Sequence, residues 1–242
     1  MRRLLLAVAI ASAGCAAPPA PVECDDADHT CLQGIVTDFL QSPLPGAELC
    51  VMDHEEIACA TTAENGAFTL PGLPLQEDIV VLQRKDGYQP TAYPLDSAQA
   101  PAIAWAMRML PDSLVETQRN AVNEEVQPGT GGLFFELGVR TSADPLAWTD
   151  VEGATVEVSP GDGGDLYYLN VLYMPDADLT STTGVGFVGV MNLEPGDYEV
   201  VATAPAGDCT TEMISWAFEP GDPVPALAID GFATYFSIGC PG

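Results

Sequence analysis

Turn signals recur along the whole chain, and they constrain its fold more than any other feature. Glycine and proline occur 23 and 21 times, and they separate short segments rich in β-branched and aromatic residues. A spacing of about ten residues per segment is typical of an all-β sandwich. Asn65-Gly66 is the strongest of these signals because both residues tolerate positive φ. This dipeptide predicts a hairpin.

The first half of the chain is expected to form short strands. We predict them at residues 34–38, 47–52, 56–62, 67–70 and 79–83. In segment 103–109, Ile103, Trp105, Met107 and Met109 alternate with smaller or charged residues, which indicates a further strand. A helix is the open alternative for this segment.

A helix is predicted after Pro111. Asp112 or Ser113 is a suitable cap for a helical segment at 114–125, which has a modest apolar side. The glycine-rich stretch 127–132 then ends the helix and indicates a boundary between two domains.

The second half has the same β pattern as the first. Strands are predicted at residues 133–140, 153–159, 166–173, 185–190, 198–203, 213–218 and 234–238. The predicted fold is therefore all-β, with two tandem Ig-like β-sandwiches joined by a short helical linker. The sandwiches are expected at 31–110 and 131–242, with the linker at 111–130.

The start of the chain has the features of an export signal. Arg2 and Arg3 precede the apolar run 4–11 and the small residues 12–14, and Cys15 follows. This order resembles a bacterial lipobox, which implies a signal peptide at 1–14 and lipidation of Cys15. Residues 15–30 would then form a lipidated tether and an acidic loop, and two acyl chains would give stable anchoring. Ser12 departs from the pattern, so a soluble protein cleaved near Ala17 is the alternative.

The charge excludes one large class of partners. Removal of the first 14 residues leaves five basic and 35 acidic residues, which lowers the net charge from −28 to about −30. A surface this acidic repels phosphate backbones, so we expect no nucleic-acid binding.

The cysteines indicate an oxidising compartment. Apart from Cys15, the chain has an even set of six, which in an exported protein is most simply three disulfides. We favour the local pairs Cys24–Cys31, Cys50–Cys59 and Cys209–Cys240. A bond from Cys31 to Cys50 or Cys59 stays open.

The two halves share an order of features, with Gly46-Ala47 and Gly153-Ala154 before a strand, and Gly66-Ala-Phe and Gly186-Phe later. In the first half, residues 34–38, 43–47, 61–70 and 87–88 resemble carboxypeptidase regulatory-like (transthyretin-like) domains, and residues 131–204 resemble them more weakly. The resemblance implies a seven-strand sandwich without chemistry of its own, used as an accessory, spacer or binding module.

No catalytic pattern is found in the sequence. The two histidines, His29 and His54, are not in a zinc-binding motif and have no partner at the spacing of a hydrolytic triad. His54 is expected at a hairpin tip. We therefore predict that the protein is not an enzyme and has no resident cofactor.

Calcium is the one metal that the sequence suggests. Asp176, Asp178 and Thr180 alternate as at the start of a calcium loop, although position twelve of that loop would be Phe187. A solvated acidic turn is the simpler interpretation there, as it is at the acidic clusters 25–28 and 162–165. Four aromatic residues in the second half could form a sugar platform or pack at sheet edges: Trp148, Tyr167, Tyr168 and Tyr173.

The predicted function is a non-catalytic lipoprotein of the bacterial cell envelope that serves as a structural or binding module. Its lipid would hold it to a membrane, most simply the outer membrane at its periplasmic or surface face. The partner would be an envelope protein or a polysaccharide. The alternative function is a calcium-dependent carbohydrate-binding surface lipoprotein.

Overall fold

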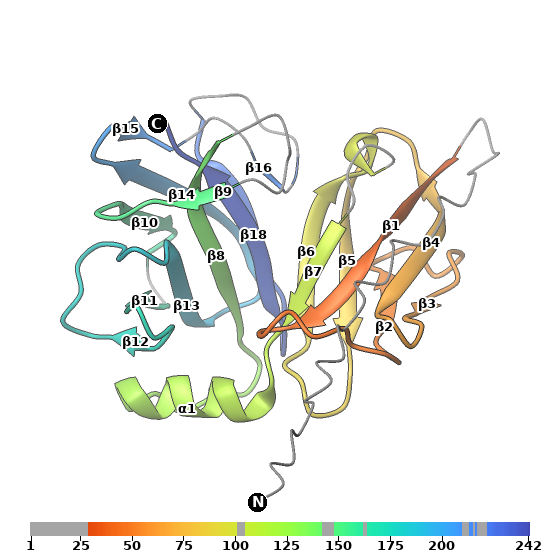
Figure 1. The fold of residues 1–242 in the computed structure, drawn as a ribbon, viewed down its shortest axis with the longest axis horizontal. Coiled ribbons are helices and arrows are strands. Elements are labelled where there is room, and N and C mark those ends of the chain that lie inside the picture. The colour runs from red at the N-terminus through yellow and green to blue at the C-terminus, as the bar shows by residue number, and fades with distance from the viewer. Residues whose placement is uncertain are drawn as a thin grey trace, which may run out of the picture.

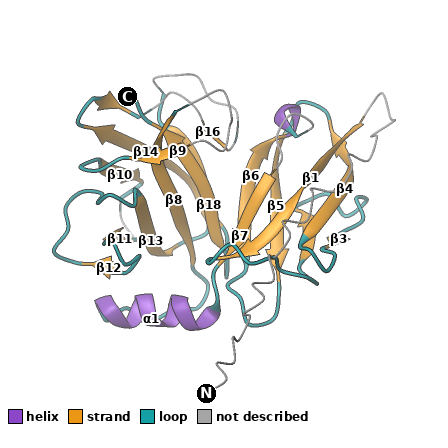
Figure 2. Cartoon of the chain, viewed as in Figure 1, coloured by secondary structure: helices purple, strands orange, loops and turns teal. Residues whose placement is uncertain are grey.

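The computed structural model describes residues 29–100, 105–141, 148–161, 164–209, 213–214, 216 and 222–242. These residues form two β-sandwiches with one α-helix between them in sequence (Figures 1 and 2). The predicted fold class is thus confirmed.

The first sandwich contains the seven strands that the family resemblance implies. One sheet has the order β4-β1-β7, and the facing strands have the order β3-β2-β5-β6. Parallel pairing of β1 with β7 confirms the predicted strand over Trp105–Met109 and excludes the helical alternative there, while residues 103–104 lie outside the described residues. The strands are β1 (His29–Asp38), β2 (Glu48–Val51), β3 (Ala60–Thr61), β4 (Ala67–Pro74), β5 (Asp78–Arg84), β6 (Thr91–Asp96) and β7 (Trp105–Met109), with a 3-10 turn at Ser97–Gln99.

The second sandwich repeats this plan with additional strands. Its sheet β13-β8-β18 corresponds to β4-β1-β7, and β10-β14-β17 corresponds to β2-β5-β6. β8 pairs in parallel with β18, as β1 does with β7 in the first sandwich. The strands are β8 (Gly131–Arg140), β9 (Trp148–Asp150), β10 (Thr155–Ser159), β11 (Asp165–Leu169), β12 (Pro175–Asp176), β13 (Phe187–Leu193), β14 (Gly196–Ala204), β15 (Gly207–Asp208), β16 (Met213–Ile214), β17 (Val224–Ala228) and β18 (Ala233–Gly239).

The two sandwiches are joined edge to edge. The last strand, β18, pairs in parallel with β6 at Ala233–Thr91 and Thr234–Ala92, so one sheet runs through both units. Beside this junction Val80, Ala92 and Phe232 form a small buried cluster. The prediction of a helical linker therefore described only the connection along the chain, because the sandwiches also share backbone hydrogen bonds.

The predicted helix is present as α1 (Asp112–Val122) and lies along one end of the second sandwich (Figure 1). Its cap differs from the prediction, because Pro111 occupies the N-cap position and no side chain caps the helix there. The helix ends at Asn123, which takes the left-handed conformation that commonly follows a last helical turn. It is attached to the second sandwich by Gln118, whose Nε2 donates to the Tyr173 carbonyl at 2.9 Å.

The Gly-Ala repeat has a structural basis in a buried threonine. In the first sandwich the Thr62 hydroxyl donates to the Leu44 carbonyl at 2.6 Å and accepts the Ala47 N–H at 2.8 Å. The backbone of Thr62 also exchanges hydrogen bonds with Gly46 and Ala47. The threonine thereby fixes the turn that begins β2.

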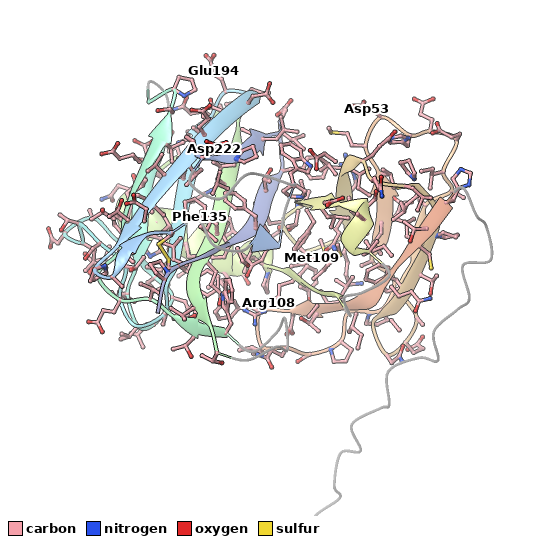
Figure 3. All side chains as sticks on the ribbon, turned by 90° about the horizontal axis from the view of Figure 1, so that it is seen from above. Asp53, Arg108, Met109, Phe135, Glu194 and Asp222 are labelled. Atoms are coloured by element: carbon pink, nitrogen blue, oxygen red, sulfur yellow. A yellow bond between two sulfur atoms is a disulfide. The ribbon has the colours of Figure 1, made fainter. Side chains whose placement is uncertain are left out.

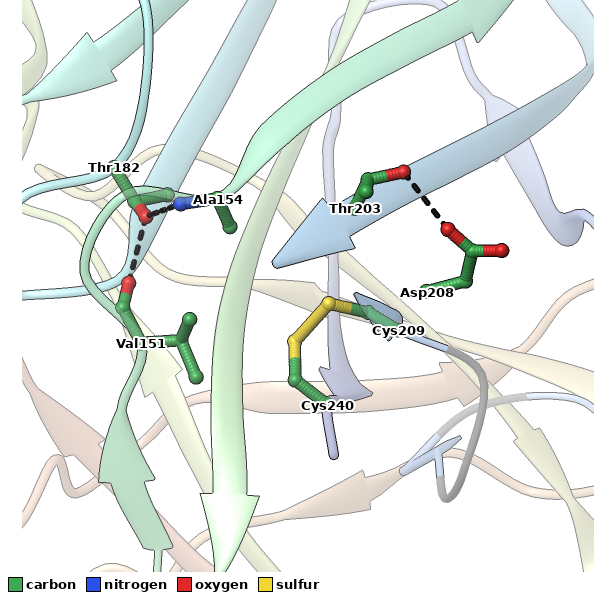
Figure 4. The surroundings of a disulfide bond; sticks show 7 residues. All are labelled: Val151, Ala154, Thr182, Thr203, Asp208, Cys209 and Cys240. Atoms are coloured by element: carbon green, nitrogen blue, oxygen red, sulfur yellow. Dashed lines mark hydrogen bonds between the residues drawn. A yellow bond between two sulfur atoms is a disulfide. The ribbon is translucent and has the colours of Figure 1, made fainter. Parts of the chain in front are cut away.

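The second sandwich repeats this arrangement atom for atom. The Thr182 hydroxyl donates to the Val151 carbonyl at 2.6 Å and accepts the Ala154 N–H at 2.9 Å (Figure 4). Its backbone exchanges hydrogen bonds with Gly153 and Ala154, as in the first sandwich. Thr62 and Thr182 are thus equivalent positions of an internal repeat.

Gly66 and Gly186 are a second pair of equivalent positions. Both have positive φ, 75° and 64°, and their carbonyls accept the N–H groups of Val36 and Leu137 at 2.9 Å. A Cβ at Gly66 would lie 2.5 Å from the carbonyl oxygen of Val36, and a Cβ at Gly186 would lie 2.5 Å from that of Leu137. Only glycine fits such a close approach of two backbones.

The prediction of a hairpin at Asn65-Gly66 was wrong. The flanking strands β3 and β4 pair with β2 and β1 respectively, so the turn crosses from one sheet to the other. Gly66 does take the positive φ of a tight turn, but its contact with β1 directs the chain to the facing sheet. Other predicted strands differ from the structure in extent: segment 56–62 is a strand only at Ala60–Thr61, and segment 166–173 only as far as Leu169. The strands β6 and β17 were not predicted.

Two of the favoured disulfides are confirmed. Cys50–Cys59 closes the loop between β2 and β3, and Cys209–Cys240 ties the chain after β15 to the end of β18 (Figure 4). Cys31 is also disulfide-bonded, and the alternatives that paired it with Cys50 or Cys59 are excluded. Its predicted partner Cys24 lies outside the described residues, so that pair stays a prediction.

None of the helices in the described residues is long and apolar enough to cross a membrane.

Candidate functional site

The outer face of the second sandwich's β13-β8-β18 sheet lies against the first sandwich. Side chains alternate along β8, so that Phe135 and Leu137 enter the core while Phe134 and Glu136 point outward. On β18 the outward residue beside Phe134 is Tyr235. Tyr235 contacts Tyr93 of β6 with ring centroids 5.2 Å apart, which places this face at the junction of the two sandwiches.

Six aromatic rings form a continuous row along this junction. Successive ring centroids lie between 4.9 and 6.0 Å apart, a spacing at which aromatic pairs attract beyond simple burial. The first and last rings belong to the first sandwich and the four between them to the second. In order, the row consists of Phe39, Tyr173, Phe187, Phe134, Tyr235 and Tyr93.

A cluster of ionisable side chains adjoins the row. The Tyr235 hydroxyl donates to Oε2 of Glu136 at 3.0 Å, and the carboxyls of Glu136 and Asp150 are close enough to affect each other's pKa. Arg108 of β7 contributes the nearby positive charge, and Figure 3 shows it where the two sandwiches meet. We call Tyr93, Arg108, Glu136, Asp150 and Tyr235 the acid–tyrosine cluster.

The environment of the cluster favours neutral carboxyl groups. Burial, and then the neighbouring Asp150 carboxylate, raise the pKa of Glu136 to about 7, against smaller opposing effects of Tyr235 and Arg108. Burial also raises the pKa of Asp150. Near neutral pH the pair therefore holds a proton that ordinary carboxyls would have released.

Tyr93 closes the open edge of the first sandwich at the same place. Its hydroxyl accepts the Arg108 N–H at 2.6 Å and donates to the Arg108 carbonyl at 2.8 Å, so it bridges β6 and β7. Burial raises its pKa well above the usual range, and the phenol stays neutral. The corresponding bridge in the second sandwich is made by Thr234, which donates to the Leu227 carbonyl at 2.6 Å.

The histidines lie away from this cluster. His29 begins β1, and His54 lies in the β2–β3 loop, as predicted for a hairpin tip. Nδ1 of His54 is 2.9 Å from Oε1 of Glu56, which is an exposed pair and contributes little to stability.

The calcium candidates form a turn. Oδ1 of Asp176 accepts the Asp178 N–H at 3.0 Å, and the Asp176 carbonyl accepts the Leu179 N–H. This Asx turn explains the residue types without a metal. Calcium binding by Asp176, Asp178 and Thr180 stays a prediction.

Among the described residues, one group brings three potential metal ligands together, and it consists of Glu48, Cys50 and Cys59. Its two sulfur atoms are joined in a disulfide. They are not thiolates and therefore do not offer the ligands that a zinc site needs.

The four aromatic residues proposed for sugar binding have separate roles. Tyr168 enters the core of the second sandwich and its hydroxyl accepts the Val156 N–H, whereas the Tyr167 hydroxyl donates to Glu124. These two tyrosines lie on opposite faces, as expected. Tyr173 belongs to the aromatic row, and the Trp148 ring lies over Gly138.

One feature of the sequence indicates the acid–tyrosine cluster. Glu136 is the only charged residue in the otherwise apolar segment 133–139. A carboxyl on a strand whose outward neighbours are aromatic indicates a buried or interfacial position. Cys15, the predicted lipidation site, lies outside the described residues.

Comparison with known proteins gives fold-level likenesses only. No protein-family model and no curated protein matches the sequence. Among solved structures, the Bacillus anthracis TIE protein has a TM-score of 0.26 and 13% identity, with 88% of this chain covering 34% of that one. Shaft pilin SpaA of Lactobacillus rhamnosus GG has a TM-score of 0.26 and 14% identity, with coverages of 88% and 99%. BcpA, the major pilin subunit of Bacillus cereus, has a TM-score of 0.26 and 10% identity, with coverages of 87% and 99%. No functional conclusion is taken from these matches.

Proposed function

We propose that this protein is a non-catalytic lipoprotein of the bacterial cell envelope that presents its paired sandwiches as one structural or binding module. The observation that carries the proposal is the pairing of β18 with β6, which joins two repeated units into a single sheet. Two sandwiches connected in this way keep a fixed relative orientation. A fixed orientation suits a module that transmits load or holds a binding face in place.

The polar groups at the junction are used for structure, which agrees with a non-catalytic role. Tyr93 bridges two strands and Tyr235 pairs with Glu136. The predicted export signal and lipidation of Cys15 support an envelope location, and the disulfides agree with an oxidising compartment. The partner would be an envelope protein or a polysaccharide.

The anchor is tested by metabolic labelling with a radioactive fatty acid in a Gram-negative host, followed by detergent phase partition. We expect wild-type protein to carry label and to enter the detergent phase, and Cys15→Ala protein to do neither. Unlabelled wild-type protein in the aqueous phase would contradict the anchored module. Recovery of partners from the native envelope, with the Cys15→Ala chain as control, would then separate a polysaccharide from a protein.

A further inference from the structure

A cavity of about 220 Å³ lies between α1 and the outer face of β8 and β13. Its walls are mainly apolar and include Val115 of the helix, Val126 after it, and Phe134 and Met191 of the two strands. Ligand sites in proteins are typically concave and mostly apolar, with a few polar groups that fix orientation. A volume below the roughly 300 Å³ at which drug-sized sites begin indicates a small ligand. We call this cavity the helix pocket.

Arg119 provides the charge in the helix pocket. It lies in the last turn of α1, and its side chain is half-buried. No hydrogen bond or ion pair joins this guanidinium to any residue that the structure describes. Burial lowers its pKa, which reflects the cost of a cation without a close partner.

The other described basic side chains have clear neighbours. Arg84 lies over the Phe232 ring at 4.4 Å, Nζ of Lys85 donates to the Pro45 carbonyl at 2.6 Å, and Arg108 adjoins Glu136. A half-buried arginine that lacks a partner is unexpected in a chain with a net charge of −28.

Arg119 lines a neighbouring hollow together with Glu124, and the carboxylate of Glu124 is already engaged. Oε1 of Glu124 accepts the Tyr167 hydroxyl at 2.9 Å, and its Oε2 accepts Nδ2 of Asn192 at 3.2 Å. These two hydrogen bonds hold the carboxylate toward β11 and β13. The guanidinium therefore stays available to a ligand in the helix pocket.

Gly189 leaves the floor of the helix pocket open. It lies on β13 between the core residues Val188 and Val190, so its missing side chain would point to the outer face, toward Phe134. A Cβ there would meet only the Phe134 ring, at 3.8 Å, which is ordinary contact. Backbone geometry therefore does not require a glycine at this position, and the absence of a side chain creates space.

We propose that the helix pocket binds a small apolar monocarboxylate. The carboxylate pairs with the Arg119 guanidinium, and the apolar tail lies over Gly189 between Phe134 and Val115. Arginine favours this partner because its planar fork matches two carboxylate oxygens. The proposal is independent of the lipid anchor, since the pocket is lined by α1, β8, β13, the start of β18 and nearby loops that include Gln89 and Pro90.

The test uses the full chain with Cys15→Ala, so that no attached acyl group competes, and calorimetric titration with octanoate or with 1-octanol. We expect octanoate to bind at least tenfold more tightly than the uncharged alcohol, because only the carboxylate forms charge-assisted hydrogen bonds with the guanidinium. Arg119→Gln should remove this preference and leave octanol binding unchanged. Equal binding of octanoate and octanol, or no binding of either, would overturn the proposal.

Two variants establish where binding takes place. Gly189→Val should fill the pocket and abolish binding of both compounds while the melting temperature stays the same or rises, since valine favours strands. Lys85→Gln removes one positive charge outside the pocket lining and should leave both affinities unchanged. Wild-type affinity in a folded Gly189→Val protein, or a loss in Lys85→Gln equal to that in Arg119→Gln, would exclude the helix pocket as the site.

Discussion

The two sandwiches are built on the same plan, but corresponding faces of them have different chemistry. In the first, the outer face of β4-β1-β7 carries Gln33, Ile35 and Thr37, which are partly exposed. In the second, the corresponding face of β13-β8-β18 carries Phe134 and Phe187, and α1 and the first sandwich adjoin it. The two sandwiches therefore share their strand order, while their outer side chains differ according to whether other parts of the protein pack against that face.

The features that the two sandwiches share lie where buried backbone groups need hydrogen-bond partners. Thr62 and Thr182 bond equivalent pairs of backbone groups, and Gly66 and Gly186 approach the equivalent strands β1 and β8 equally closely. Buried backbone donors and acceptors require partners wherever the turn recurs. We therefore expect matched substitutions in the two sandwiches to have similar effects, and differences to appear where the disulfides and the covers differ.

The disulfides should give the largest difference between the sandwiches. Loop-closure entropy predicts that loss of Cys209–Cys240, with a sequence separation of 31, costs about 3–4 kcal/mol. Loss of Cys50–Cys59, with a separation of 9, should cost about 2–3 kcal/mol. Paired Cys→Ala variants, compared by urea unfolding, measure both values. A larger loss for the shorter loop would show that the entropy of the unfolded chain does not control the difference.

The glycine pair should show the repeat most directly. Gly66→Ala and Gly186→Ala each place a Cβ 2.5 Å from a carbonyl oxygen at a positive φ. We expect each substitution to lower the free energy of unfolding by about 2–3 kcal/mol. Gly87→Ala is the matched control, since it has positive φ but no atom within 4 Å of the added Cβ. If Gly66→Ala and Gly186→Ala cost no more than the control, the close approach would not be the reason for glycine.

The sequence predicted the repeat, the helix and most strands because these follow from local chemistry. It missed β6 and β17, which are equivalent strands and contain Pro94 and Pro225. Proline lacks the N–H that a central strand needs, so a segment that contains it is not expected to form such a strand. Both prolines are tolerated because β17 is an edge strand and β18 pairs with β6 only at Thr91 and Ala92.

The candidate site depended on long-range packing, which the sequence pattern does not contain. Glu136 and Asp150 are 14 positions apart in the chain, and Tyr93 comes from the other sandwich. Their shared environment exists only once β18 has paired with β6. The sequence could show that Glu136 is an unusual residue in its segment, but it could not identify the neighbours that raise its pKa.

The buried threonines should give a smaller and matched effect. Thr62→Val and Thr182→Val keep the side-chain shape and remove a hydroxyl that joins a carbonyl to an N–H group. Each variant leaves two buried backbone groups without that partner, and we expect a loss of about 1–2 kcal/mol. Thr203→Val, at an exposed hydroxyl bonded to Asp208, is the control and should change stability little. Unequal losses for the two buried sites, measured by urea unfolding, would break the equivalence.

The acid–tyrosine cluster should give the smallest effect, and only the second sandwich's covered face should show it. The folded-state pKa of Glu136, about 7, exceeds the ordinary value of 4.5. Between these values the folded state binds more protons than the unfolded state, so its stability falls as pH rises through this range. Glu136→Gln keeps a hydrogen-bonding group without this penalty. It should raise the free energy of unfolding at pH 8 by about 1 kcal/mol, after allowance for partial solvent access, and change it less at pH 5.

The control for this pH effect is Glu199→Gln, at an exposed position on β14. It removes the same charge from the same sandwich, and its effect on stability should be small at both pH values. An equal gain at pH 8 in both variants would mean that relief of the overall negative charge, and not the covered face, causes the stabilisation. A gain in Glu136→Gln alone would show that the burial of Glu136 on the covered face, beside Asp150, causes the pH dependence.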